Sequence, residues 1–158
     1  MLMKRMIELA NLKFEEDQII SISFVGPRTI ARINKKFLGH IGLTDVISFD
    51  YRESDNIYQD NEITSELIVS PDMALMEASK RRDSSFAYEM TLYLVHGILH
   101  IAGENDLSPK ERTKMKRKEK QIIKKLQNEF SLESIFKKNN SKIDISNNNN
   151  QIKAQTIY

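Results

Sequence analysis

Two histidines four residues apart, His96 and His100, limit what this chain can fold into more than any other feature. They lie at the end of a mostly apolar run, residues 90–95, which predicts a buried helix that enters from the serines at 84–85. Side chains four apart on a helix lie on one face. Both imidazoles can therefore reach a single metal ion.

A glycine and a carboxylate follow this pair at a workable spacing. Gly103 stands where helices often end in a left-handed turn, and such a turn would bring Asp106 back toward the histidines. Three protein ligands with a fourth position open are the arrangement of catalytic zinc sites. An isolated histidine pair more often serves packing, but this chain has only three histidines and two fall here. We predict one Zn²⁺ per chain, held by His96, His100 and Asp106.

The whole string, residues 96–106 (His-Gly-Ile-Leu-His-Ile-Ala-Gly-Glu-Asn-Asp), resembles the signature of the YbeY-type endoribonucleases, which are bacterial rRNA maturation factors. Residues 44–49 (Thr-Asp-Val-Ile-Ser-Phe) resemble the second motif of that family, and residues 33–34 and 66–70 are similar to its members at corresponding places. The resemblance covers about residues 18–126 in order and spacing. Many members have histidine where this chain has Asp106, and aspartate can also ligate zinc.

The resemblance implies a metal-dependent single-strand endoribonuclease acting in 16S rRNA 3′-end maturation and ribosome quality control, with His96 and His100 catalytic. It implies rRNA and the ribosomal small subunit as partners and no organic cofactor. Two alternatives remain. A metalloprotease-like hydrolase is disfavoured by Gly97, which stands where the His-Glu-x-x-His motif has its glutamate base. A catalytically weak RNA- or ribosome-binding module is favoured by Leu38, at the position of a family arginine.

Clustered cations suggest where RNA would bind. Nine lysines and arginines lie between residues 110 and 125, opposed by two glutamates, and phosphate backbones attract such surfaces. We predict contacts from this helix and from a second basic pair; the residues are Lys114, Arg117 and Lys118, with Lys35 and Lys36. The alternative is an ordinary solvated helix face. The sequence offers no evident aromatic platform for stacking bases, so we predict no sequence-specific readout.

Composition sets the remaining limits. The chain has 158 residues, 40% of them apolar, which suits one domain with one core, and its net charge of +2 gives no global case for nucleic acid. The absence of cysteine rules out disulfides and thiolate metal sites and fits a reducing cytoplasm. No apolar run reaches the length of a signal peptide or a membrane span, so we expect a cytoplasmic protein without membrane contact.

The pattern predicts an α+β domain, a small mixed sheet covered by helices with the metal-binding helix at its centre. We assign residues 1–136 to this domain and 137–158, rich in Asn, Lys and Ser, to a disordered tail. The N-terminus looks shortened relative to the family, which removes one strand and leaves three. The predicted strands span 19–25, 46–51 and 63–69, and the predicted helices 1–11, 27–37, 71–82, 86–102 and 109–128.

Overall fold

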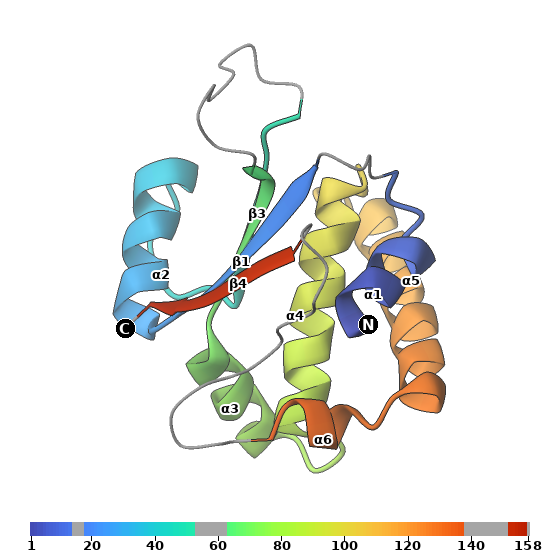
Figure 1. Cartoon of the computed structure of the whole chain (residues 1–158). Helices are drawn as coiled ribbons and strands as arrows, with labels where there is room; N and C mark the ends of the chain where they lie inside the picture. Colours follow the sequence, from blue (N-terminus) through green and yellow to red (C-terminus); the bar gives the residue numbers. More distant parts are fainter. Residues whose placement is uncertain (14–17, 53–62, 138–151, 158) are drawn as a thin grey trace.

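A computed structural model describes residues 1–13, 18–52 and 63–137, together with the backbone of Ile152–Ile157. It confirms the predicted α+β class (Figure 1). The elements in chain order are α1 Leu2–Leu9, β1 Ile19–Val25, α2 Pro27–Ile33, the π-helix η1 Asn34–Leu38, β2 Val46–Asp50, β3 Ile63–Val69, α3 Pro71–Lys80, α4 Phe86–Ile101, α5 Pro109–Glu129, α6 Leu132–Ile135 and β4 Ile152–Ile157. No helix among the described residues is both long and apolar enough to cross a bilayer.

The sheet is mixed and has four strands in the order β2-β3-β1-β4. β1 runs parallel to β3 and β4, and β2 runs antiparallel to β3. Two expectations need correction here: the sheet has more than three strands, and Ile152–Ile157 is a strand rather than part of a disordered tail. Polar composition reports local preference only, whereas β4 pairs with an edge of β1 that would otherwise expose unpaired backbone groups. Residues 138–151 and 158 of the predicted tail lie outside the described residues.

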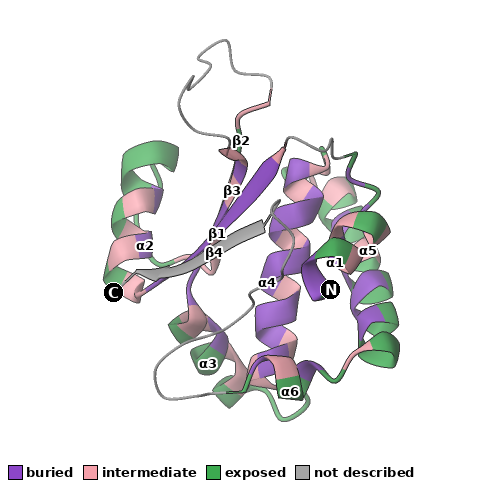
Figure 2. Ribbon diagram, in the orientation of Figure 1, coloured by how far each residue is buried: buried purple, intermediate pink, exposed green. Residues whose placement is uncertain are grey.

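Helices cover the two faces of the sheet unequally. On one face β1 contributes Ile20, Ile22 and Phe24 to a large core shared with α1, α4, α5 and α6. On the other face α2 covers a small cluster that includes Ile30 and Ile68. β1 is buried along its whole length, and its alternate side chains therefore point to a thick side and a thin side of the molecule. Figure 2 shows α4 as a mostly buried helix between the sheet and α5.

A glycine lets α4 approach the sheet closely. A Cβ atom at Gly97 would lie 2.6 Å from Cδ2 of Leu67 and 3.3 Å from Cγ2 of Val46. Both distances are shorter than ordinary contact, so only glycine fits without displacing its neighbours. Ser85 caps α4, because its Oγ accepts a hydrogen bond from the backbone N–H of Tyr88 at 3.1 Å. The cap and the close approach together fix how α4 presents the residues next to Gly97.

Candidate metal centre

The three predicted ligands lie together on one side of α4. The Nε2 atoms of His96 and His100 are 3.0 Å apart, and Oδ1 of Asp106 lies 3.9 Å from Nε2 of His100. One ligand atom from each residue lies within 4.8 Å of the others, and all three side chains are half-buried. The helix places the two imidazoles one turn apart, as the four-residue spacing requires.

The carboxylate returns to the histidines through the predicted left-handed turn. Gly103 has a φ of +87°, a conformation that glycine adopts without strain. Its N–H donates to the carbonyl of His100 at 2.9 Å, and the N–H of Glu104 donates to the carbonyl of Leu99 at 2.9 Å. These bonds satisfy carbonyls that the end of the helix leaves open. The turn reverses the chain and sets Asp106 beside His100.

Each histidine is held through its outer ring nitrogen. Nδ1 of His96 lies 2.7 Å from Oε1 of Glu119 on α5, and Nδ1 of His100 lies 2.9 Å from the backbone oxygen of Glu104. Carboxylate and carbonyl oxygens accept hydrogen bonds, so both Nδ1 atoms carry the hydrogen when the rings are neutral. The Nε2 lone pairs then face each other and Asp106. This tautomer and these partners are those of metal-binding histidines, so the donor set fits a zinc ion.

Electrostatics differ between the two rings. Burial alone would lower the pKa of His96, but the hydrogen bond and the charge of Glu119 outweigh it and the pKa lies above its usual value. Burial lowers the pKa of His100, and the neighbouring His96 lowers it further. Glu119 on α5 thus acts most strongly on the pKa of His96, its hydrogen-bond partner, and acts on the pKa of His100 only through its charge.

Glu119 and Glu104 were missed by the sequence analysis. Glu119 is buried, at 8% exposure, on a helix that is otherwise strongly basic. The available sequence signal was an acidic residue on the face of α5 that also carries Met115 and Ile122, which pack inward. The side chain of Glu104 forms ion pairs with Lys114, at 2.8 Å, and with Lys118. Hydrogen bonds from these two lysines lower the pKa of Glu104.

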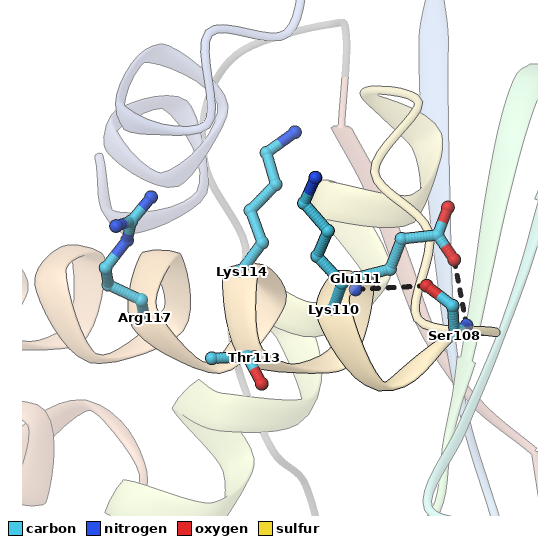
Figure 3. A pocket seen from close by; sticks show the side chains of 6 residues that line it. All are labelled: Ser108, Lys110, Glu111, Thr113, Lys114 and Arg117. Atoms are coloured by element: carbon cyan, nitrogen blue, oxygen red, sulfur yellow. Dashed lines mark hydrogen bonds between the residues drawn. The ribbon is translucent and has the colours of Figure 1, made fainter.

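These ion pairs bear on the predicted RNA contacts of α5. Lys114 and Lys118 share their charge with Glu104, whereas Arg117 is exposed. Arg117, Lys110 and Lys114 line a surface hollow of about 750 Å³. Figure 3 shows these three side chains extending from one side of α5. Within the predicted set, the structure therefore separates Arg117, which forms no ion pair among the described residues, from two lysines that are already paired.

The other predicted RNA contacts lie on a different element. Lys35 and Lys36 are exposed on η1, and the ammonium of Lys36 lies 5.0 Å from the ring centroid of Phe37. Leu38 is 47% exposed at the end of the same π-helix. Because leucine is uncharged, this position offers no charge to a phosphate. The sequence shows no evident aromatic platform, but in the structure the rings of Phe37, Phe49 and Tyr51 lie next to one another.

Comparisons with known proteins agree with this site and fold. The family described as Endoribonuclease YbeY matches residues 1–127. The endoribonuclease YbeY of Thermodesulfovibrio yellowstonii is 33% identical over 109 residues, covering 68% of this chain and 67% of the relative. That of Elusimicrobium minutum is 37% identical over 107 residues, covering 68% and 73%.

A solved structure supports the fold independently. A Thermotoga maritima protein, whose structure was determined in solution, superimposes with a TM-score of 0.54 over 81% of this chain and 80% of its own, at 24% identity. That likeness concerns the fold alone. The family match spans 127 of 158 residues and includes the three clustered ligands. This chain is therefore a member of the endoribonuclease YbeY family, a family of RNA-cleaving hydrolases.

Proposed function

We propose that this protein is a metal-dependent endoribonuclease that cleaves single-stranded RNA with one Zn²⁺ per chain. His96, His100 and Asp106 hold the ion. In the cell the enzyme acts in the cytoplasm on rRNA of the ribosomal small subunit, in 16S rRNA 3′-end maturation and ribosome quality control. The support is the family membership together with a ligand set whose chemistry suits zinc.

One observation carries the proposal: both Nδ1 atoms are held by oxygen acceptors while both Nε2 atoms converge with Asp106. That arrangement holds the rings in the orientation and tautomer that bind a metal. Zinc in a site with an open position lowers the pKa of bound water to about 7 and polarises phosphoryl oxygens. Glu119 keeps the hydrogen on Nδ1 of His96, and the turn at Gly103 holds Asp106 in place.

The basic residues supply the attraction to RNA in this proposal. Arg117 and Lys110 are exposed beside the hollow on α5, and Lys35 and Lys36 are exposed on η1. Cations on a protein surface release counterions from a phosphate backbone, which favours binding at low salt. Lys114 and Lys118 contribute less because Glu104 neutralises part of their charge.

A second candidate function is an RNA- or ribosome-binding module that cleaves slowly. The observation that favours it is Leu38, an uncharged and exposed residue where the family resemblance leads one to expect arginine. A cleavage assay on zinc-loaded protein separates the two functions. The metalloprotease alternative lacks comparable support, because position 97 has no room for a glutamate side chain against Leu67.

The test compares the unmodified protein with His96→Leu and Asp106→Ala. Zinc content, melting temperature with and without zinc, and cleavage of a labelled single-stranded RNA are measured on each. We expect one zinc per chain, a rise in melting temperature on adding zinc, and cleavage, all lost in His96→Leu. Asp106→Ala should weaken zinc binding, whereas Glu104→Ala should change it less, because only the backbone oxygen of Glu104 contacts His100.

Two results would contradict the proposal. A His96→Leu protein that still gains stability from zinc and still cleaves RNA would place the metal elsewhere. Equal loss of zinc from Glu104→Ala and Asp106→Ala would mean that the wrong carboxylate is assigned. Zinc binding without cleavage by the unmodified protein would favour the binding module.

A further inference from the structure

Exposed apolar side chains gather in one short stretch, residues 37–43, between η1 and β2. Phe37, Leu38, Ile41 and Leu43 expose 59%, 47%, 89% and 54% of their surface. Single exposed apolar residues are ordinary on protein surfaces, but a contiguous group of this kind marks a surface that binds a partner or a ligand. The metal centre does not account for this group.

An ordered turn holds these side chains outward. Gly39 and Gly42 have φ values of +70° and +126°, which other residues rarely adopt. The buried side chain of Asn34 donates from Nδ2 to the carbonyl of Gly42 at 3.3 Å, which ties the turn back to η1. η1 is a π-helix, a rare element that often occurs at functional sites. The exposure is therefore built into the backbone.

The stretch begins at an aromatic row made of Phe37, Phe49 and Tyr51. Phe37 meets Phe49 edge to face with ring centroids 5.6 Å apart, and Phe49 stacks on Tyr51 at 6.0 Å with an angle of 8° between the rings. The ammonium of Lys36 lies 5.0 Å from the centroid of Phe37. Phe37 is exposed, whereas Phe49 and Tyr51 are half-buried behind it. An exposed ring beside cations suits single-stranded nucleic acids, because a base can stack on the ring and the cations neutralise phosphates.

The stretch ends against the metal-binding helix. Leu43 lines a hollow of about 310 Å³ together with Leu92 and Tyr93 of α4, one turn before His96. Val46, at the start of β2, lies next to Gly97. The apolar side chains thus extend from the aromatic row to the turn of α4 that precedes the first histidine. A single RNA strand bound at the metal centre would therefore meet the Leu43 end of this surface about one helical turn away.

We propose that residues 37–43, with the rings of Phe49 and Tyr51, form a base-binding surface for single-stranded RNA next to the metal centre. The inference rests on the proposed function, since it assumes that RNA reaches the metal. Lys35 and Lys36 favour RNA over an apolar protein partner, because an apolar partner would gain nothing from two exposed cations at the edge of its contact. Every base has a stacking face, so the surface tolerates any sequence.

The test measures binding without cleavage. Fluorescence anisotropy follows a labelled single-stranded oligoribonucleotide as the protein, kept metal-free with a chelator, is added. Phe37→Ala should raise the Kd for RNA about tenfold, as loss of one stacking contact does. Phe37→Tyr keeps an aromatic ring and should bind like the unmodified protein. Ile41→Ser should also weaken binding. Met76→Ala, at an exposed apolar position on α3, is the matched control and should bind like the unmodified protein.

An oligonucleotide of equal length with internal abasic sites isolates the bases. On that probe the unmodified protein and Phe37→Ala should bind alike, because only phosphate contacts remain. The surface is refuted if Phe37→Ala and Ile41→Ser, both with unchanged melting temperatures, bind base-containing RNA as the unmodified protein does. It is also refuted if the Phe37→Ala defect persists on the abasic probe.

These outcomes stay distinct from those that test the nuclease. Unmodified protein that binds RNA through Phe37 but does not cleave it with zinc contradicts the proposed enzyme and supports the base-binding surface. Unmodified protein that cleaves, while Phe37→Ala binds and cleaves equally well, contradicts the surface and leaves the enzyme intact.

Discussion

The metal centre and the basic surface of α5 use the same helix pair in different ways. At the metal centre each histidine has its own oxygen acceptor, and the rings are half-buried. On the basic surface the cations extend outward, and Arg117, which has no ion pair among the described residues, lines an open hollow. A metal ion demands fixed ligand positions, whereas phosphates respond to charge at many positions. Single substitutions should therefore weaken metal binding strongly at the metal centre and change RNA binding only slightly on the basic surface.

The largest expected effect tests the scaffold of the metal centre. Gly97→Glu would create the sequence His-Glu-x-x-His, but its side chain would enter the core beside Leu67. Overpacking and an unpaired buried carboxylate together cost at least about 3 kcal/mol, so the protein should unfold or lose most of its stability. Thermal or urea denaturation measures the loss.

Gly26→Glu is the matched control for that change. A Cβ at Gly26 meets nothing within 4 Å, and the residue precedes the first turn of α2, where an acidic side chain is favourable. Its melting temperature should stay close to that of the unmodified protein. A stable Gly97→Glu protein with peptidase activity would overturn both the packing argument and the exclusion of a protease.

The next effect concerns the acceptor on α5. Glu119→Ala should weaken zinc binding by about 10- to 100-fold, because His96 would lose the partner that orients its ring. Glu119→Gln should lose less, since an amide oxygen can still accept from Nδ1. Competition with a chelator of known affinity measures the zinc Kd. Glu129→Ala, on the same helix but paired with Arg5, should leave the Kd unchanged; an equal loss there would indicate a general weakening of α5.

Sequence alone predicted what depends on local spacing. β1 and β3 match their predicted bounds, and the turn at Gly103 is left-handed as predicted. Each of these follows from neighbours within four residues in the chain. The clustering of His96, His100 and Asp106 is equally local, since the three residues fall within a stretch of 11 residues.

What sequence missed depends on contacts between distant segments. Glu119 lies 23 residues from His96, and its role arises only when α5 packs on α4. The aromatic row joins Phe37 to Phe49 across a turn, and β4 pairs with β1 from more than 120 residues away. The sequence identified the cations of α5 as a set, but it did not indicate which of them would pair with Glu104. Contacts between segments far apart in the chain are therefore what the structure adds to the sequence pattern.

A smaller effect should follow from removing Glu104 from its two lysines. Glu104→Gln frees Lys114 and Lys118, so RNA should bind several-fold tighter at low salt. The slope of log K against log salt should steepen by roughly 0.7 for each cation that then contacts phosphate. Glu111→Gln removes the same charge near the two lysines, from the helix that carries them, but leaves their pairs with Glu104 intact, and glutamine also serves in a capping box. If both variants change the slope equally, net charge rather than the freed lysines is responsible.

The smallest effect distinguishes cations within α5. Arg117→Ser should flatten the salt dependence of RNA binding by roughly 0.7, because an exposed guanidinium is lost. Lys114→Ser should flatten it less, because the ammonium of Lys114 lies 2.8 Å from a Glu104 oxygen and part of its charge is already neutralised. Binding titrations at several salt concentrations give both slopes, and the zinc Kd of each variant should match that of the unmodified protein. Equal flattening by the two substitutions would show that RNA displaces Glu104 from Lys114, and the basic surface would then adjust to its ligand as the metal centre does not.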